Sequence, residues 1–279
     1  MKANYPLWTK LPYAGEDKPP KNSEEPLAGS WTLFYLKRGN RGFTTRGGTP
    51  VKLNIKNPNT VDWNEELKVV QNTLKKINRR QIQIAKYWGT GVATKQWTPI
   101  IDRLIDAYGA SAPRAARILA TVQAGINDAY IIAWYLKFKW LVARPNQQDH
   151  NLATFLCTPR HPTYPSGHAT ISGTASTMLS YFFPSEKQRL TELAEENALS
   201  RLYAGVHFPI DNSEGLKLGR QIGRIAVNVL RKQKNSKNQP IDLPYEENLN
   251  ADLQPPPYEQ AIPFNFDQKC ESLVIPTFY

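Results

Sequence analysis

The sequence predicts an all-α protein, built as a helical bundle with an irregular N-terminal arm and a proline-rich C-terminal tail. Three observations lead to this prediction. Apolar residues recur at helical spacing between residues 62 and 232, residues 1–60 are rich in Pro, Gly and Asn, and the chain from Gln239 onward is rich in Pro without periodicity. We therefore expect an arm over 1–60, a helical domain over 61–235 and an extended tail over 236–279.

Within the arm, the runs 31–36 and 51–55 are rich in strand-forming residues and predict at most one hairpin. The periodic part of the chain begins after it. Helical spacing predicts a first helix over residues 62–88, followed by two glycines as stop signals; the apolar positions are Leu67, Val70, Leu74, Ile77 and Ile84.

Five further helices are expected, over residues 99–108, 111–143, 167–182, 186–203 and 210–232. Pro145 is expected to end the long second one, because the residue before a proline is driven out of the α region. In the last helix, Gly215, Gly219 and Gly223 share a face and would allow close helix–helix contact. The alternative is that these glycines are merely tolerated, at a cost in helix propensity. The tail is either disordered or an extended arm lying on a partner subunit.

The composition excludes an integral membrane protein. With 41% hydrophobic and 21% charged residues, the chain resembles a globular protein, and no stretch reaches the roughly eighteen uncharged apolar residues of a membrane span. The most apolar stretch, 129–143, is interrupted by Lys137 and Lys139. The N-terminus lacks the apolar run of a signal peptide, so a cytoplasmic location is expected.

Cys157 and Cys270 lie far apart and match no metal-binding spacing, which favours two free thiols in a reducing compartment. The net charge of +11 raises the question of nucleic-acid binding. The basic runs 75–80 and 231–234 fall on expected helix surfaces and ends, where such charges usually face solvent, so nucleic acid is a disfavoured partner. The charge is better suited to steering small anionic substrates.

Chemically specific residues gather in three short blocks: Lys137 to Arg144-Pro145, Pro165-Ser166-Gly167-His168, and Ser200-Arg201 through His207 to Asp211. Together they offer three cations, a hydroxyl, a glycine amide at a helix start and two histidines, one with a carboxylate nearby. Such a set suits a tetrahedral or trigonal-bipyramidal oxyanion such as phosphate or vanadate. A divalent cation would instead require several convergent carboxylates or thiolates.

The first two blocks each have an anion-binding interpretation. Lys137 and Arg144 are seven residues apart, two helical turns, so both are expected on one face of the 111–143 helix together with Trp134. The neighbouring residues are mostly apolar, so an inward charge there needs an anionic partner. Ser166 is expected to cap the next helix, and Gly167 lets the backbone approach a ligand at the helix start. A solvated lysine and an ordinary capped helix are the alternatives.

The third block predicts a reactive histidine. Arg201 and His207 would not share a face of one helix, but Gly205 permits the helix to end between them. Asp211, one turn after His207, can hold the Nδ1–H group and leave Nε2 as the reactive atom. Taken alone, a His–Asp pair of this kind is more often structural.

In order and separation, these blocks resemble the signature of the superfamily that joins type 2 phosphatidic acid phosphatases, bacterial non-specific acid phosphatases and vanadium-dependent haloperoxidases. The resemblance covers about residues 120–230 and implies their helical-bundle fold. It implies that His207 is the vanadium ligand or the phosphate-accepting nucleophile and that His168 is the acid/base. The resemblance further implies which residues hold the equatorial oxygens of the bound vanadate or phosphate: Lys137, Arg144, Ser166, Gly167 and Arg201.

Three details resemble haloperoxidases more than phosphatases. Trp134 precedes Lys137 by three positions, as in the haloperoxidase version of the first block, where it would line a halide pocket. Residues 196–207 resemble the fungal chloroperoxidase version of the third block. His161 stands seven residues before His168, where bromoperoxidases carry a second histidine and chloroperoxidases a phenylalanine; an ordinary loop histidine is the alternative.

The resemblance therefore implies a vanadate cofactor, with phosphate as the alternative occupant, and oxidation of bromide or iodide by hydrogen peroxide. His168 would help to deprotonate the peroxide and Lys137 would polarise it. The alternative function is a phosphomonoesterase that forms a phosphohistidine at the same residues. The expected partners are small molecules (peroxide, halide or a phosphate ester), and a homodimer is expected if the arms wrap around a neighbour.

Overall fold

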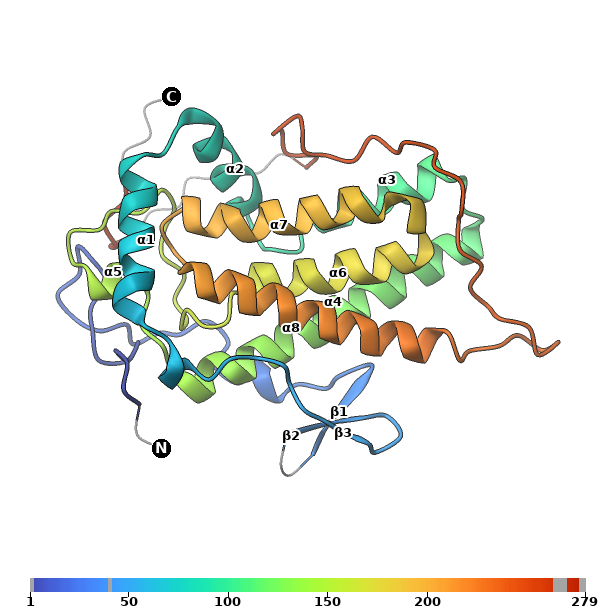
Figure 1. Ribbon diagram of the computed structural model, residues 1–279, viewed down its shortest axis with the longest axis horizontal. Helices are drawn as coiled ribbons and strands as arrows, with labels where there is room; N and C mark the ends of the chain where they lie inside the picture. Colours follow the sequence, from blue (N-terminus) through green and yellow to red (C-terminus); the bar gives the residue numbers. More distant parts are fainter. Residues whose placement is uncertain (1–2, 40–41, 263–269, 276–279) are drawn as a thin grey trace.

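The computed structural model describes residues 3–39, 42–262 and 270–275, and this part of the chain is mostly helical (Figure 1). Its α-helices are α1 (Trp63–Lys75), α2 (Arg79–Gly89), α3 (Trp97–Ala107), α4 (Ala112–Trp140), α5 (Pro145–Gln148), α6 (Gly167–Phe182), α7 (Lys187–Tyr203) and α8 (Pro209–Leu230). Short 3₁₀ turns occupy Ala28–Ser30, Pro58–Thr60 and Pro184–Glu186. The prediction of an all-α bundle is confirmed, with one small sheet beside it.

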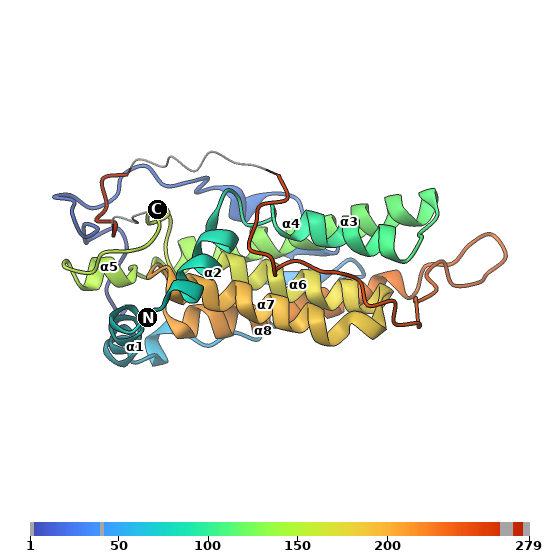
Figure 2. The same cartoon turned by 90° about the horizontal axis from the view of Figure 1, so that it is seen from above.

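Helix α6 is the central element of the bundle. It lies between α4 on one side and α7 and α8 on the other, and all four run along the long axis of the molecule (Figures 1 and 2). Its side chains Ile171, Ala175, Met178 and Leu179 are fully buried in the main apolar core. Within the described residues, no helix combines the length and apolarity needed to cross a bilayer.

Three glycines set the spacing between α6 and α8. A Cβ atom on Gly219 would lie 2.0 Å from the carbonyl oxygen of Thr170, and one on Gly215 would lie 2.9 Å from the Cβ of Ala169. A Cβ on Gly223 would be equally crowded, 2.8 Å from a side-chain atom of α6. The predicted close approach is confirmed, and any side chain at these positions would push the two helices apart.

The expected first helix, over 62–88, is in fact two helices. Asp62 caps α1 by accepting hydrogen bonds from the amides of Asn64 and Glu65. Asn78 then caps α2 in a reciprocal arrangement with Gln81, with both bonds at 3.0 Å. The apolar spacing continues across the junction, but the capping box starts a new helix in a new direction.

The long helix α4 ends at Trp140, not near residue 143. Leu141 adopts a left-handed conformation, with φ of 54°, which terminates the helix. Pro145 occupies the first turn of α5 and does not end α4. The prediction that Lys137 and Arg144 share one helix face is therefore wrong, because Arg144 lies in the connection beyond the helix.

The arm forms a three-stranded antiparallel sheet from β1 (Leu36–Gly39), β2 (Gly42–Thr45) and β3 (Pro50–Val51), in the order β1-β2-β3. The predicted strands 31–36 and 51–55 overlap these strands only at Leu36 and Val51. Most of the first run is irregular because the Asp128 carboxylate on α4 accepts hydrogen bonds from the amides of residues 34–36, at 2.7, 2.8 and 3.3 Å. The same bonds fasten the arm to the bundle.

The described part of the tail is an extended segment that lies on its own bundle, whereas the expected contact with a partner subunit stays a prediction (Figure 1). Asp242 accepts a 2.7 Å bond from Arg117 of α4, and the Tyr245 amide donates to the end of α6 at 2.8 Å. Leu253 is buried against the main core. Some predicted tail prolines, Pro263 and Pro276, lie outside the described residues.

The prediction of two free thiols is also wrong. Cys157 and Cys270 form a disulfide with a Cα–Cα distance of 5.9 Å, across a sequence separation of 113 residues. Disulfides persist mainly in oxidising compartments, so the cysteines no longer support the expected cytoplasmic location, which stays a prediction. The bond fastens the C-terminal segment to the loop between α5 and α6.

Candidate active site

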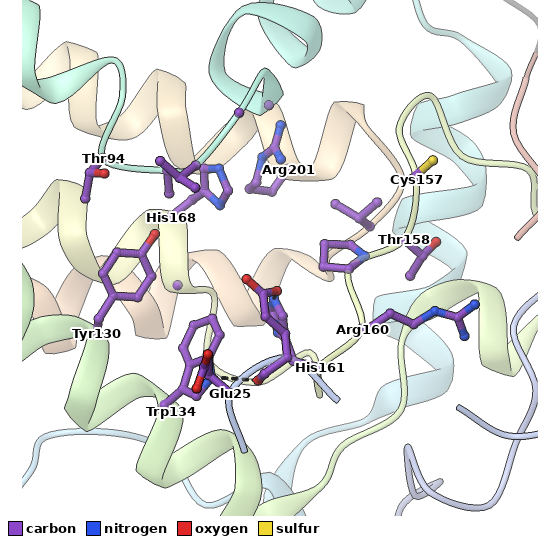
Figure 3. Close-up of a pocket in the computed structure, with 18 of the residues that line it drawn as sticks. Glu25, Thr94, Tyr130, Trp134, Cys157, Thr158, Arg160, His161, His168 and Arg201 are labelled. Carbon is purple, nitrogen blue, oxygen red and sulfur yellow. Dashed lines mark hydrogen bonds and ion pairs between the residues drawn. The ribbon is translucent and has the colours of Figure 1, made fainter. Parts of the chain in front are cut away.

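A cavity of about 1120 Å³ lies between helices α4, α6 and α7, the loops 91–95 and 156–161, and part of the N-terminal arm. The N-terminus of α6 contributes His168, the C-terminal turn of α7 contributes Arg201, and the turn before α8 contributes His207. Trp134 comes from α4 and His161 from the loop before α6. In Figure 3 the side chains of Trp134, His161, His168 and Arg201 surround a common space.

His207 is held with one ring nitrogen bonded to a carboxylate. Its Nδ1 lies 2.8 Å from Oδ2 of Asp211, and its Nε2 lies 3.0 Å from Nη1 of Arg144. A carboxylate accepts and a guanidinium donates, so the proton resides on Nδ1 and Nε2 presents its lone pair. The predicted orientation by Asp211 is present, and burial together with Arg144 and Lys137 lowers the His207 pKa well below 6.5.

Thr163 is a site residue that the sequence did not reveal. Its hydroxyl donates a very short hydrogen bond to Oδ2 of Asp211 and lies 3.1 Å from Nδ1 of His207. Its carbonyl oxygen accepts from Nζ of Lys137 at 2.8 Å. Thr163 thus joins the carboxylate, the imidazole and one cation. A threonine in a loop carries no spacing signal, and only its position three residues before Ser166 hinted at the site.

Lys137 and Arg144 converge on the site although they do not share a helix. Both side chains are fully buried. Nζ of Lys137 donates to the carbonyl oxygens of Pro162 and Thr163 at 2.7 and 2.8 Å. Arg144 donates to the carbonyl oxygens of His161 and Val206 at 3.0 and 2.7 Å, in addition to its contact with His207. These bonds place both cations directly behind the cavity wall.

Arg201 is the cation that lines the cavity itself. Its Nη2 donates to the carbonyl oxygen of Ala85 at 3.0 Å and its Nε to the Ser200 hydroxyl at 3.1 Å, which leaves Nη1 without a hydrogen-bond partner among the described residues. A Cβ on Gly89 would lie 2.6 Å from Arg201 Nη2, so the guanidinium needs a glycine there. Burial, helped by Arg144, lowers the Arg201 pKa to about 9.

All three cations thus have lowered pKa values. For Lys137 the causes are burial followed by repulsion from Arg144, and for Arg144 burial alone lowers the pKa. Asp211 is the buried carboxylate beside them, and burial raises its own pKa. Positive charge therefore exceeds negative charge within this low-dielectric region, which a bound anion of multiple charge would balance.

The start of α6 has the serine cap that the sequence predicts. Ser166 caps the helix by accepting from the Ala169 amide at 3.3 Å, and it is fully buried behind the cavity. Gly167 lines the cavity, where a Cβ would make only ordinary contacts, at 3.4 Å or more. The protein itself has room for a side chain at this position. The prediction that glycine is needed for a ligand to approach the backbone therefore stays a prediction.

His168 carries a nitrogen without a partner. Its Nε2 is buried and makes no hydrogen bond to any residue that the structure describes, while the backbone of Trp88 bonds to the ring. Burial and the positive charge of Arg201 lower its pKa well below 6.5, so the ring is neutral near pH 7. A buried nitrogen without a partner is costly unless a ligand or water satisfies it.

His161 belongs to the site and is not an ordinary exposed loop histidine. Its ring lies 4.6 Å from that of Trp134, and Nδ1 lies 3.0 Å from Nη2 of Arg144. Burial and the charges of Lys137 and Arg144 lower its pKa well below 6.5. The side chain lines the cavity and is only 7% exposed.

The N-terminal arm closes one side of the cavity, which the sequence did not predict. The Glu24 carboxylate lies 4.0 Å from Nε2 of His161. The backbone carbonyl oxygen of Glu24 accepts a hydrogen bond from Nε1 of Trp134 at 3.2 Å. Ala28 and Trp31 line the same wall. Nothing in the irregular composition of the arm indicated that it would pack there.

Comparisons with known proteins agree with this geometry. A sequence profile of the PAP2 superfamily matches residues 117–235. A vanadium-dependent bromoperoxidase from Corallina officinalis is 31% identical over 27% of this chain and 17% of its own length. A decaprenylphosphoryl-5-phosphoribose phosphatase from Mycobacterium tuberculosis is 32% identical over 42% of this chain and 64% of its own length.

Solved structures share the fold at lower identity. A bacterial vanadium-dependent iodoperoxidase superposes with a TM-score of 0.64 at 23% identity, covering 82% of this chain and 62% of that one. A bacterial vanadium-dependent chloroperoxidase gives 0.60 at 15% identity, covering 81% and 62%. The chain thus spans less than two thirds of the length of each of these proteins.

Proposed function

The chain belongs to the PAP2/vanadium haloperoxidase superfamily, and from this premise we propose that it is a vanadate-dependent haloperoxidase that oxidises bromide or iodide with hydrogen peroxide. One observation carries the proposal. His207 directs an unprotonated Nε2, fixed by Asp211, into a region where three buried cations lack matching negative charge. That arrangement supports bonding of the imidazole to the central atom of a multiply charged oxyanion.

The residues present fit vanadate. Arg201 offers an unused Nη1, and Nζ of Lys137 has three donors, of which two are engaged by carbonyl oxygens. The Gly167 amide lies at the start of α6, where the helix dipole favours negative charge. With Ser166 and Arg144 close behind, this set would hold the oxygens of vanadate, and His207 would hold its central atom.

When bound, vanadate would supply a pentavalent Lewis-acidic centre that activates peroxide toward halide. The chain's own contribution is positioning and proton transfer. His168, neutral and with a free Nε2, can take a proton from hydrogen peroxide. The cations stabilise the negative charge that develops on oxygen, with Lys137 polarising the bound oxygen from behind the wall.

His161 and Trp134 support the halide part of the proposal. The two rings lie side by side on the cavity wall and offer a polarisable surface beside the anion site. Arg144 holds the His161 ring in place through a 3.0 Å contact. A large, soft halide such as bromide or iodide suits this wall better than a small, strongly hydrated one.

Phosphomonoester hydrolysis is the second candidate, favoured by the similarity to the mycobacterial phosphatase. In that reaction His207 Nε2 attacks phosphorus and the P–O bond to the leaving alcohol breaks. His168, which the bound anionic ester would favour in its protonated form, gives its Nε2 proton to the alcohol. Water then hydrolyses the phosphohistidine. The donors that would hold vanadate would also hold the phosphoryl oxygens, because vanadate resembles the transition state of phosphoryl transfer.

A paired assay distinguishes the two functions. The purified chain is incubated with orthovanadate, peroxide and bromide in the presence of an organic acceptor, and separately with a chromogenic phosphate ester. The proposal expects bromination that added phosphate suppresses. Ester hydrolysis that vanadate inhibits, without bromination, would replace it by the second candidate. The variant His150→Ala serves as control, since this histidine is exposed and outside the cavity.

A further inference from the structure

A second hollow lies on the opposite half of the bundle, between α7 and α8 above the later part of α6. Its volume is about 440 Å³. It shares no lining residue with the active-site cavity. The lining residues are Ser176, Thr177, Ser180, Tyr181, Lys187, Thr191, Arg220, Arg224, Val227, Asn228 and Arg231. We call it the basic groove.

One wall of the basic groove is a stripe of arginines. Arg220, Arg224 and Arg231 are separated by four and seven residues, so they project from nearly the same face of α8. At 1.5 Å per residue they extend over about 16 Å. Lys187, exposed at the start of α7, faces them from the other wall.

The floor consists of small hydroxyl side chains. Ser176 and Thr177 donate to the carbonyl oxygen of Gly173 at 3.3 and 2.7 Å, and Ser180 donates to Ser176 at 2.6 Å. These short side chains leave the space between the two basic walls open. The floor is therefore polar and uncharged.

No lining residue of the basic groove is acidic. Glu195 bonds to Arg220 at 2.8 Å, outside the groove lining, and Arg231 stacks on Tyr181 at 5.5 Å. Arg224 and Lys187 line the groove, and neither forms an ion pair with a carboxylate of the described residues. Apart from Arg220, which is paired with Glu195, three cations meet in a concave surface; this raises the local positive potential and attracts anions of multiple charge.

We propose that the basic groove is a second anion site, separate from the active site, that binds a small soluble polyanion with two or more linked phosphate groups. The length of the arginine stripe favours an elongated ligand over a single orthophosphate, which could contact only neighbouring cations. Guanidinium groups suit phosphate oxygens because they donate two parallel hydrogen bonds. His168, at the start of α6, lies about 18 Å along the helix axis from Ser180, so occupancy of the groove does not require occupancy of the active site.

Calorimetric titration with inorganic tripolyphosphate tests the proposal. The double variant K187Q/R224Q removes one cation from each wall, and K75Q/K76Q removes the same charge from an exposed pair on α1. Loss of two charge-assisted contacts is expected to weaken tripolyphosphate binding at least about 10-fold in the groove variant only. Titration of His207→Ala separates the groove from the active site, and binding is expected to survive that substitution.

Four results would overturn the proposal. Equal weakening in both double variants would indicate unspecific attraction to net charge. Loss of binding in His207→Ala would place tripolyphosphate in the active site. If orthophosphate bound the groove as tightly as tripolyphosphate, the groove would not select for an elongated ligand. Binding to vesicles of anionic phospholipid without binding to tripolyphosphate would indicate a membrane surface in place of a soluble polyanion.

Discussion

Gly89 offers a specific test of the active-site geometry, because its replacement by alanine should displace Arg201 while leaving the fold intact. The added Cβ would lie 2.2 Å from Cδ1 of Leu156 and 2.6 Å from Nη2 of Arg201. Both atoms are the far ends of flexible side chains, so the clash can be relieved by rotation and not by backbone movement. Arg201 would then lose its present orientation toward the cavity.

The expected magnitude follows from the contact that is lost. A hydrogen bond to a charged group contributes about 1.5–3 kcal/mol, so orthovanadate should bind Gly89→Ala roughly 10- to 150-fold more weakly. Binding is measured by calorimetry, and folding by thermal unfolding, which should change little. Gly47→Ala is the matched control, since its Cβ would approach no atom closer than 3.9 Å. Unchanged vanadate affinity in Gly89→Ala would refute the assignment of Arg201 to the anion site.

Three further predictions address other parts of the account. Asp211→Asn should lower turnover about 100-fold or more, because His207 loses the acceptor that fixes its tautomer; Asp252→Asn, at an exposed position, should retain wild-type turnover. Three buried histidines have pKa values lowered well below 6.5, so the unfolded chain takes up protons first as the pH falls. The unfolding free energy without added anion should therefore decrease from about pH 7 to pH 5, despite the opposite contribution of Asp211, whose pKa is raised; a flat denaturation profile would contradict this. Replacing Cys157 and Cys270 by serine should cost about 4–5 kcal/mol of stability, given the 113-residue separation that the disulfide spans, and chemical reduction of the wild type should give the same lower melting temperature.

Much of the fold could be predicted because local signals agreed with it. Helix α6 spans Gly167–Phe182 as expected, since Ser166 caps its start and its end comes before Pro184. The three glycines of α8 indicated close packing, and the structure places them against α6. The apolar spacing continues from α1 into α2, so it could not show that one helix ends and another begins at the Asn78 cap.

The candidate site was predictable in its members but not in its construction. The pairing of His207 with Asp211 followed from spacing, whereas the convergence of Lys137 and Arg144 was expected for the wrong reason. Arg144 arrives through a left-handed residue and a loop, which no periodicity encodes. Thr163 had no sequence signal beyond its position three residues before Ser166, because its role depends on contacts between segments far apart in the chain.

The arm, the tail and the disulfide were the least predictable parts. Their structure depends on single long-range contacts, such as the amides of residues 34–36 on Asp128 and the bond between Cys157 and Cys270. Irregular, proline-rich sequence does not specify its packing partner. The expected homodimer stays a prediction, and the contacts of the described tail with its own bundle do not require a second subunit.

The central claim is that His207 bonds the central atom of an oxyanion held by buried cations. Titration of the purified protein with orthovanadate, compared between wild type, His207→Ala and the exposed control His150→Ala, tests it most directly. The account predicts one bound vanadate per chain in the wild type and in His150→Ala, and loss of at least about 10-fold in affinity in His207→Ala. Equal vanadate affinity in all three proteins would contradict it.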